Sequence, residues 1–229
     1  MAESGAIIVA RMGSKRLPGK ALRASLGWPL IEIVARRLLL GGLSRERLVV
    51  ATTDRPSDEE LAHWCESFGL ECYRGDPNNV AARCLGSAEW LGWRAFARVN
   101  GDSPFAPGGL IHAALSEVES GTVSFVTNLA PRSFPYGVAV EVIDTVMYGE
   151  SLAAMRPEEA EHVTLHLYRA LPMHYKNLVC PAGDLSSVRL TVDTAADEQR
   201  INALLRLAGK TAVEADPVAL AKLQGEVSL

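Results

Sequence analysis

Residues 6–20 read AIIVARMGSKRLPGK, a short apolar run that leads directly into a loop rich in glycine and basic residues. The run at residues 6–10 has the length and the β-branched content of a buried strand. In an open parallel sheet, ligands bind beyond the carboxyl ends of the strands, so this loop lies where a ligand is expected. Gly13 and Gly19 let backbone amides approach an anion closely. The loop therefore predicts a phosphate-binding site, and its cations are Arg11, Lys15, Arg16 and Lys20.

Apolar runs rich in β-branched residues recur along the chain and alternate with longer amphipathic stretches. The runs lie at residues 6–10, 48–52, 95–100, 122–127 and 188–192. The amphipathic stretches lie at residues 29–40, 57–68, 79–91, 107–120 and 194–208. Such alternation is typical of βαβ units on a parallel sheet. The sequence therefore predicts an α/β, Rossmann-like fold with a mostly parallel, doubly wound sheet.

The segment at about residues 131–182 departs from this rhythm, because prolines divide it into shorter elements. Two runs in it, at residues 138–143 and 173–179, have the composition of strands. We expect these strands to form a small antiparallel excursion from a single domain that spans residues 1–229.

The composition bounds the class of protein. Of the 229 residues, 48% are hydrophobic and 22% are charged, which excludes a disordered or collagen-like chain. The net charge of −4 opposes a nucleic-acid partner unless basic residues cluster locally. The first ten residues hold too short an apolar run for a signal peptide or a membrane span, and the four cysteines include no Cys-x-x-Cys pair. We expect a cytoplasmic protein with reduced thiols and with neither a nucleic-acid nor a membrane partner.

The glycine-rich loop does not match the common nucleotide-binding patterns. A Walker loop has four residues between its glycines and a hydroxyl residue after its lysine. Here five residues separate Gly13 from Gly19, and Ala21 follows Lys20. The Gly-x-Gly-x-x-Gly pattern of dinucleotide-binding proteins is absent as well. A Walker-type ATPase and a dinucleotide site are therefore both disfavoured.

Two aspartates follow predicted strands. Asp102 comes after the run at residues 95–100, and Asp193 comes after the run at residues 188–192. Because the carboxyl ends of parallel strands meet at one edge of a sheet, we expect both carboxylates to emerge there. Mg²⁺ binds through one or two carboxylates plus substrate phosphates, so the pair is a candidate magnesium site. The alternative for Asp193 is a cap on the helix that begins at Thr194.

The sequence resembles a known family at the loop and beyond it. The motif Ala-Arg-Met-Gly-Ser-x-Arg-Leu-Pro-Gly-Lys at residues 10–20 is similar to the signature of the KDO and acylneuraminate cytidylyltransferases, especially the branch of the spore coat polysaccharide biosynthesis protein F. The resemblance covers nearly the whole chain and continues at residues 50–53, 74–75, 101–104, 161–164 and 185–194. It implies a magnesium-dependent enzyme that couples CTP to an acidic sugar or related acidic acceptor. The implied products are a CMP-linked acceptor and pyrophosphate.

The resemblance also implies which residues form the nucleotide site. Arg11 and Lys20 hold the triphosphate and are the implied catalytic residues. Lys20 would stabilise the charge that rises on the α-phosphate as pyrophosphate leaves. Asp102 and Asp193 would hold Mg²⁺, in line with the strand-end argument. The other residues implied to contact the nucleotide are Ala10, Met12, Gly13, Ser14, Arg16, Arg83 and Asn100.

On the acceptor side, the resemblance implies a pocket or a dimer contact in the excursion at about residues 131–182. Arg132 is expected to hold the acceptor's carboxylate, because arginine is a planar, bidentate donor. Phe134 and Ala139 replace a tyrosine and an aspartate of the family pattern, which predicts a smaller or less hydroxylated acceptor. The expected partners are CTP, the acceptor and a second copy of the chain in a homodimer. The implied acceptor-binding residues are Asn128, Arg132, Glu141 and His162.

A zinc site is an alternative use of the histidines. His162 and His166 are four residues apart with Glu161 adjacent, a spacing that places two ligands on one helix face. The order differs from His-Glu-x-x-His, and no third ligand is evident from the sequence.

Two other functions are consistent with a nucleotide-binding fold. One is a glycosyltransferase of related fold in surface polysaccharide biosynthesis, which would commonly carry an Asp-x-Asp triplet that this sequence lacks. The other is a non-catalytic nucleotide-binding homologue. Retention of Arg11, Lys20, Asp102 and Asp193 favours the enzyme over that homologue.

Overall fold

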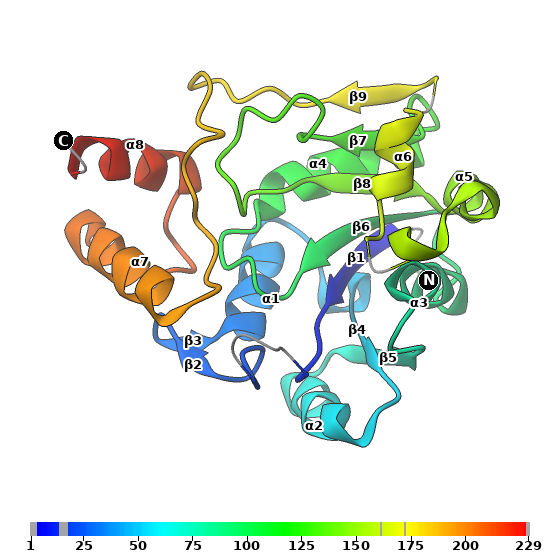
Figure 1. Ribbon diagram of the computed structural model, residues 1–229, viewed down its shortest axis with the longest axis horizontal. Coiled ribbons are helices and arrows are strands. Elements are labelled where there is room, and N and C mark those ends of the chain that lie inside the picture. The colour runs from blue at the N-terminus through cyan, green and yellow to red at the C-terminus, as the bar shows by residue number, and fades with distance from the viewer. Residues whose placement is uncertain (1–3, 14–17, 161, 172, 228–229) are drawn as a thin grey trace.

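The computed structural model describes residues 4–13, 18–160, 162–171 and 173–227. A seven-stranded sheet runs through the molecule, with helices packed against it (Figure 1). Its strands are β1 Ser4–Val9, β4 Leu48–Thr53, β5 Glu71–Gly75, β6 Ala95–Asn100, β7 Phe125–Thr127, β8 Glu141–Asp144 and β9 Tyr175–Asn177. The helices are α1 Leu30–Leu40, α2 Glu59–Phe68, α3 Val80–Trp90, α4 Gly108–Glu119, α5 Thr145–Ser151, α6 Leu165–Arg169, α7 Ala195–Ala208 and α8 Pro217–Val227.

The strand order of the sheet is β5-β4-β1-β6-β8-β7-β9. The first four of these strands are parallel to one another, β8 runs antiparallel to both β6 and β7, and β9 is parallel to β7. The chain moves outward from β1 to β4 and β5, and then returns to the other side of β1 to form β6. β1 and β6 therefore flank the topological switch point, where an open α/β sheet binds its ligand. The predicted Rossmann-like, mostly parallel fold is confirmed.

Both faces of the sheet are covered by helices. Ile8 of β1 lies in a core cluster with Val34 of α1 and Leu115 of α4, whereas its neighbour Ile7 lies in a different cluster with Cys84 of α3. Successive side chains of a strand point to opposite faces, so a strand covered on both sides is apolar at every position. This explains why residues 6–9 of β1 and 48–51 of β4 are all apolar.

The segment at residues 188–192 does not form the strand that its composition predicts. It makes an isolated bridge with Tyr136, whose N–H donates to a carbonyl of the segment and whose carbonyl accepts from the Leu190 N–H, both at 2.8 Å. Leu190 and Val192 are buried in a core cluster with Ile201 of α7. α7 and α8 lie beside the sheet, at the left of Figure 1. The prediction was wrong because the alternating apolar side chains of this segment pack against helices instead of joining the sheet.

The expected antiparallel excursion is present in part. β8 supplies the antiparallel pairing, but β9 pairs in parallel with β7, so both strands extend the main sheet. A small antiparallel pair that the sequence did not predict, β2 Ala24–Ser25 with β3 Trp28–Pro29, follows the glycine-rich loop. Within the residues that the structure describes, no helix combines the length and the apolar character needed to cross a membrane.

Candidate active site

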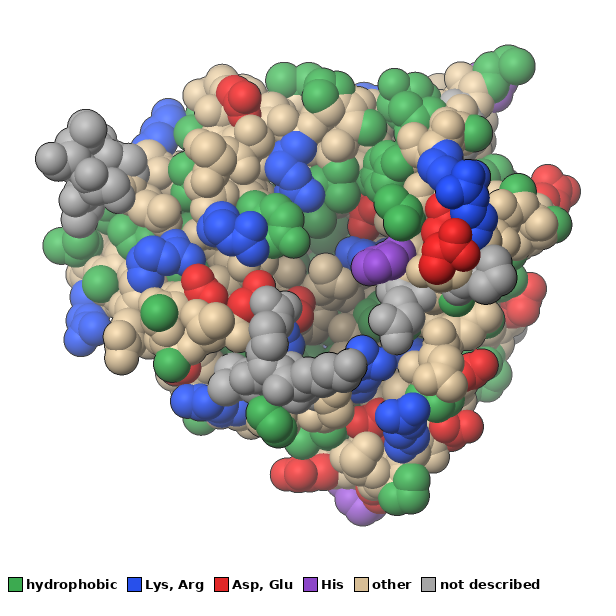
Figure 2. All heavy atoms as spheres, viewed as in Figure 1, with side chains coloured by type: hydrophobic (Ala, Val, Ile, Leu, Met, Phe, Trp, Pro, Cys, Tyr) green, Lys and Arg blue, Asp and Glu red, His purple; other side chains and the backbone are tan. Residues whose placement is uncertain are grey.

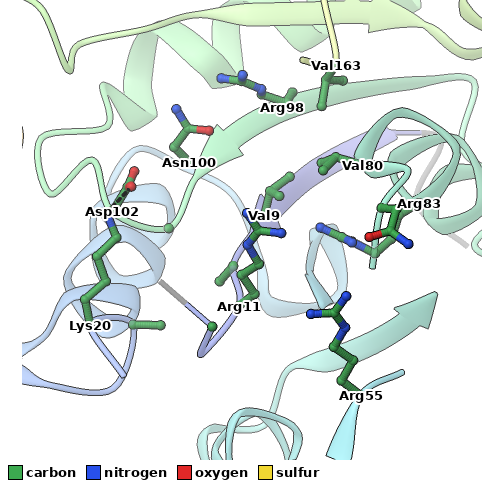
Figure 3. A pocket seen from close by; sticks show the side chains of 15 residues that line it. Val9, Arg11, Lys20, Arg55, Val80, Arg83, Arg98, Asn100, Asp102 and Val163 are labelled. Atoms are coloured by element: carbon green, nitrogen blue, oxygen red, sulfur yellow. Dashed lines mark hydrogen bonds and ion pairs between the residues drawn. The ribbon is translucent and has the colours of Figure 1, made fainter. Parts of the chain in front are cut away.

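A cavity of about 720 Å³ opens at the carboxyl ends of β1 and β6, as the topology predicts (Figure 3). The loops after these strands lie close together, because the Gly101 N–H donates to the Val9 carbonyl at 2.9 Å. A Cβ at Gly101 would lie only 2.9 Å from the Ala10 Cβ, so glycine permits this approach. Ala10 and Gly13, two residues expected at the nucleotide, line the cavity. Figure 2 shows the hollow from outside, with basic, acidic and histidine side chains at its rim.

The cavity is strongly basic. In Figure 3 the guanidinium groups of Arg11, Arg55 and Arg83 point toward one another across it. Mutual repulsion of these groups is relieved when an anion lies among them. The arrangement therefore favours a ligand with several negative charges. Among the described residues, the ionisable side chains that line the cavity are Arg11, Lys20, Arg55, Arg83, Arg98 and Asp102.

Arg83, one of the residues expected at the nucleotide, is almost fully buried. Its side chain is 2% exposed, and its Nη1 donates to the Asp76 carbonyl at 2.8 Å. Burial lowers the pKa of this guanidinium, with a smaller contribution from the charge of Arg11. Its Nε is buried with no hydrogen-bond partner. A buried donor without a partner costs free energy, so Arg83 is suited to an oxygen of an anionic ligand.

Lys20 lies between the two aspartates that the sequence singled out. Its Nζ is 2.6 Å from Asp102 Oδ2 and 3.4 Å from Asp193 Oδ1. The Lys20 side chain is 14% exposed, against 36% for Asp102 and 17% for Asp193. The structure thus brings together three residues from three distant segments, as the strand-end argument expected, although the segment before Asp193 is not a strand of the sheet.

The two carboxylates also suit a divalent cation. No group of three or more histidine, cysteine, aspartate or glutamate side chains that could hold a metal occurs among the described residues. Asp102 and Asp193 both contact Lys20, and two carboxylates suit a hard cation that completes its shell with phosphate oxygens and water. A closed zinc cage with four protein ligands does not fit this donor set.

A second cavity, of about 540 Å³, adjoins the first. The two share the side chains of Arg98, Asn100 and Asp102, all at the carboxyl end of β6. Asn100, expected at the nucleotide, therefore faces both cavities. Of the residues expected at the acceptor, three line the second cavity: Arg132, Glu141 and His162.

Arg132 lies in an environment that suits a side chain that binds an anionic oxygen. It is half-buried, burial lowers the pKa of its guanidinium, and its Nη1 is buried with no hydrogen-bond partner. Its guanidinium carbon lies 5.0 Å from the ring centroid of Tyr136, and that of Arg189 lies 4.1 Å from the same centroid. Tyr136 therefore stacks with two cations at the edge of the second cavity, which restricts the orientation of Arg132.

Glu141 is 1% exposed and makes several contacts in the second cavity. Its Oε1 accepts from Thr164 Oγ1 at 2.5 Å and from the Tyr168 hydroxyl at 2.8 Å, and its Oε2 lies 3.1 Å from Arg98 Nη1. A buried carboxylate held in this way is fixed in position. Arg98 was not among the site residues predicted from the sequence. The signal that could have found it is a basic residue inside the buried run at residues 95–100 with an acidic residue in a nearby run.

Two residues that were expected to contact the nucleotide or the acceptor do not line either cavity. Asn128 is fully buried, and its amide donates to the Val138 carbonyl at 2.8 Å and accepts from the Val140 N–H at 2.9 Å. Met12 donates its N–H to Asp58 Oδ1 at 2.7 Å and packs its side chain against the core. In the structure, Asn128 bonds to the backbone of Val138 and Val140, and Met12 bonds to Asp58, so their roles as ligand contacts stay predictions.

Two other residues expected to contact the nucleotide, Ser14 and Arg16, lie outside the described residues.

The positions of His162 and His166 do not support the zinc alternative. His162 is exposed, precedes α6 and lines the second cavity, whereas His166 is buried in α6 with its Nε2 2.8 Å from Ser151 Oγ. The two side chains therefore occupy different environments.

Asp58 is a residue at the site that the sequence analysis did not identify. Its carboxylate is 1% exposed, accepts from the Met12 N–H, and also accepts from the Thr53 N–H at 3.3 Å and from the Thr53 hydroxyl. It joins the start of the glycine-rich loop to the end of β4. α2 begins after Asp58, whose side chain makes no cap hydrogen bond to that helix.

Comparison with protein families matches residues 5–143 to a family described as cytidylyltransferase. The chain belongs to the cytidylyltransferase family. It is 30% identical over 214 residues to the spore coat polysaccharide biosynthesis protein SpsF of Bacillus subtilis, covering 89% of this chain and 87% of that protein. The resemblance inferred from the motifs is therefore confirmed.

Two further similarities extend this assignment. The chain is 35% identical over 129 residues to the 3-deoxy-manno-octulosonate cytidylyltransferase of Alkalilimnicola ehrlichii, covering 54% of this chain and 48% of that cytidylyltransferase. A solved cytidylyltransferase from Leptospira borgpetersenii superposes with a TM-score of 0.87 at 24% identity, covering 100% of this chain and 96% of the other. At that identity the superposition establishes that the two cytidylyltransferases share a fold.

Proposed function

We propose that this cytidylyltransferase transfers the cytidylyl group of CTP to a hydroxyl of a small acidic acceptor, with Mg²⁺ as cofactor. The observation that carries the proposal is the junction of the two cavities at β6, beside Lys20 and its aspartates. The basic first cavity suits a triphosphate, and the second suits an acceptor. Group transfer requires the reacting atoms of the two substrates to meet, and the junction is where they can do so.

The first cavity supplies the contacts for the nucleotide. Arg11 and Arg83 would bind the outer phosphates, because their guanidinium groups converge there and Arg83 has a buried N–H without a partner. Lys20 would contact the α-phosphate region, next to the junction. A cation that is already fixed at this position stabilises the rising charge without reorganisation, and so lowers the barrier more than it strengthens ground-state binding.

Asp102 and Asp193 would hold the Mg²⁺. When bound, the ion would offset negative charge on the phosphates and orient them. With nucleotide bound, the ammonium of Lys20 would interact both with these two carboxylates and with the phosphates. The pair of aspartates also orients the Lys20 side chain when no nucleotide is present.

The second cavity supplies the contacts for the acceptor. Arg132 would bind the acidic group through a bidentate pair of hydrogen bonds, and His162 would contact the acceptor from the opposite segment. The relative from Alkalilimnicola ehrlichii is named for an acidic sugar, which supports an acidic acceptor. In the reaction, the acceptor hydroxyl oxygen forms a bond to the α-phosphorus. The bond from that phosphorus to the bridging oxygen breaks, pyrophosphate leaves with the electron pair, and the hydroxyl proton passes to water.

Pyrophosphate release tests this proposal. Each of the four nucleoside triphosphates is incubated with a panel of sugar acids and small phosphonates, with Mg²⁺ and then with a chelator. We expect release that requires CTP, an acidic acceptor and the metal together, with a CMP-linked product of matching mass. Release with a neutral sugar alone would contradict the acceptor class. Tight CTP binding without release on any acceptor would favour a non-catalytic homologue.

We also propose that the protein acts as a cytoplasmic homodimer. The support is a group of exposed apolar side chains on and beside the edge strand β9, where Met173 is 91% exposed, Val179 70% and Tyr175 38%. Such a group at an unpaired sheet edge is typical of a contact surface. Light scattering should give twice the mass of one chain, and Met173→Glu should shift the protein toward the monomer.

A further inference from the structure

Arg98 has a position that no other described cation shares. It lies on β6, and among the residues that the structure describes it is the one basic side chain that lines both cavities. Arg11, Lys20, Arg55 and Arg83 line the first cavity, and Arg132 lines the second. The side chain of Arg98 is 18% exposed, so it is largely shielded from water.

The orientation of Arg98 is fixed by its neighbours. Its Nη1 lies 3.1 Å from Oε2 of Glu141, which is itself held by Thr164 and Tyr168. The Tyr168 hydroxyl also lies 2.7 Å from Thr127 Oγ1, so the network reaches from β6 across β8 to β7. The Arg98–Glu141 contact is an ion pair, and the hydrogen bonds to Glu141 Oε1 hold the carboxylate beside the guanidinium before any substrate arrives.

Arg98 nevertheless keeps hydrogen-bonding capacity. Its Nε is buried and has no hydrogen-bond partner. A guanidinium presents five N–H donors in a rigid fork, so one edge can hold Glu141 while another donates to a ligand.

We infer that Arg98 is a catalytic residue that contacts the α-phosphate at the junction and stabilises the charge that develops there during transfer. This inference rests on the proposed function. As the acceptor oxygen bonds to the α-phosphorus and pyrophosphate leaves, Arg98 donates hydrogen bonds to a non-bridging oxygen and undergoes no change of protonation. Glu141 is a positioning residue, because it acts through Arg98.

The geometry separates this role from that of the other cations. Lys20 is engaged by Asp102 and Asp193 and lines the first cavity only, and Arg132 lines the second cavity only. Arg98 is placed where both reacting groups meet, so its contribution belongs to the step in which they react.

Arg98→Lys tests the inference, with Arg94→Lys as the matched control. Arg94 is exposed, precedes β6 and lines neither cavity. Steady-state rates are measured with CTP and the acceptor varied in turn, and CTP affinity is measured by calorimetry. We expect Arg98→Lys to lower kcat by about 100-fold to 1000-fold, the range for losing a preorganised donor. Both KM values and the affinity for CTP should stay within about threefold of the parent, and Arg94→Lys should match the parent throughout.

Two variants protect the test from a folding defect. Arg98→Lys could leave the buried Glu141 poorly paired, so the double variant Arg98→Gln/Glu141→Gln removes both charges together. It should keep the parent melting temperature more closely and still lose kcat. Glu141→Gln alone should lower kcat by about tenfold with unchanged KM values, and its effect should be absent in the Arg98→Lys background.

Three kinetic results for Arg98→Lys would contradict a catalytic role for Arg98. A raised acceptor KM with unchanged kcat in Arg98→Lys would make Arg98 an acceptor-binding residue, and a raised KM for CTP alone would make it a nucleotide-binding residue. Either result, or parent kinetics, overturns the inference. The proposed function is tested separately on the unsubstituted protein, because its failure would appear there as a lack of pyrophosphate release.

Discussion

The ammonium of Lys20 lies 2.6 Å from the carboxylate of Asp102, although 82 residues separate them in the chain. The contact joins the loop after β1 to the loop after β6, across the switch point of the sheet. A cation and an acidic pair are thus held together at the one place where the two cavities meet.

Lys20→Ala should lower kcat by about 100-fold to 1000-fold, because a preorganised cation at the α-phosphate is removed. Circular dichroism should match the parent, since Lys20 belongs to a loop and does not support the core. Lys20→Arg keeps the charge and should recover part of the rate. Near-normal turnover by Lys20→Ala at an unchanged melting temperature would remove Lys20 from the catalytic residues.

Asp102→Asn and Asp193→Asn should each raise the Mg²⁺ concentration needed for half-maximal rate, because one negative ligand is lost at nearly constant size. Rates are measured over a magnesium titration at saturating CTP. Asp184→Asn is a matched control, since Asp184 is exposed and lines neither cavity. Titration curves that superimpose on the parent curve for both variants would exclude the two-aspartate site.

Arg132→Lys should raise the KM for the acceptor and leave that for CTP unchanged. A lysine is a point charge and cannot reproduce two parallel hydrogen bonds to a carboxylate. Initial rates with each substrate varied in turn give the two constants. An effect on the CTP constant alone would move Arg132 to the nucleotide site, and unchanged constants would make it a surface residue.

Residues that directly follow a strand could be placed beside the cavity from the sequence. The loop after β1 and the aspartate after β6 follow from strand ends and residue type, because the chain itself places them at the switch point. The environment of Arg98 could not be predicted in this way. Its partner Glu141 lies 43 positions along the chain on an antiparallel strand, so the ion pair depends on a strand pairing that periodicity does not specify.

Burial explains why some sequence predictions differ from the structure. Leu190 and Val192 have strand spacing, but their side chains are buried against α7, and only packing determines which partner an apolar residue finds. Asn128 was assigned to the acceptor as a polar residue of a family motif. A polar side chain has the same identity in the sequence whether it faces a cavity or satisfies a buried backbone, and here it does the latter.

The buried hydrogen bonds of Asn128 give a stability prediction. Asn128→Leu should lower the free energy of unfolding by about 1–3 kcal/mol or more, because the Val138 carbonyl and the Val140 N–H lose their partner in a buried site. Urea unfolding measures the change. Where the variant remains folded, its KM for the acceptor should equal that of the parent. A raised acceptor KM at parent stability would favour the role of acceptor ligand.

His166 makes the stability depend on pH. Burial lowers the pKa of its imidazole below the usual histidine value of 6.5. Glu159 opposes this with a smaller effect, and Arg169 lowers the pKa a little further. A histidine with a lowered pKa is harder to protonate when folded, so stability is lost as the pH falls below 6.5 toward the pKa of the folded state. The free energy of unfolding should therefore fall between pH 7.5 and pH 5, and His166→Gln should reduce that fall. An equal fall in parent and variant would contradict the assignment.

A crystal structure of the protein with CTP and Mg²⁺ tests the central claim most directly, namely that the two substrates meet at the end of β6. The account predicts a triphosphate in the first cavity among Arg11 and Arg83, with Mg²⁺ touching Asp102 and Asp193. It predicts that the α-phosphate lies at the junction within hydrogen-bonding distance of Arg98, with the second cavity open beside it. A triphosphate in the second cavity, or an α-phosphate far from the junction, would contradict the account.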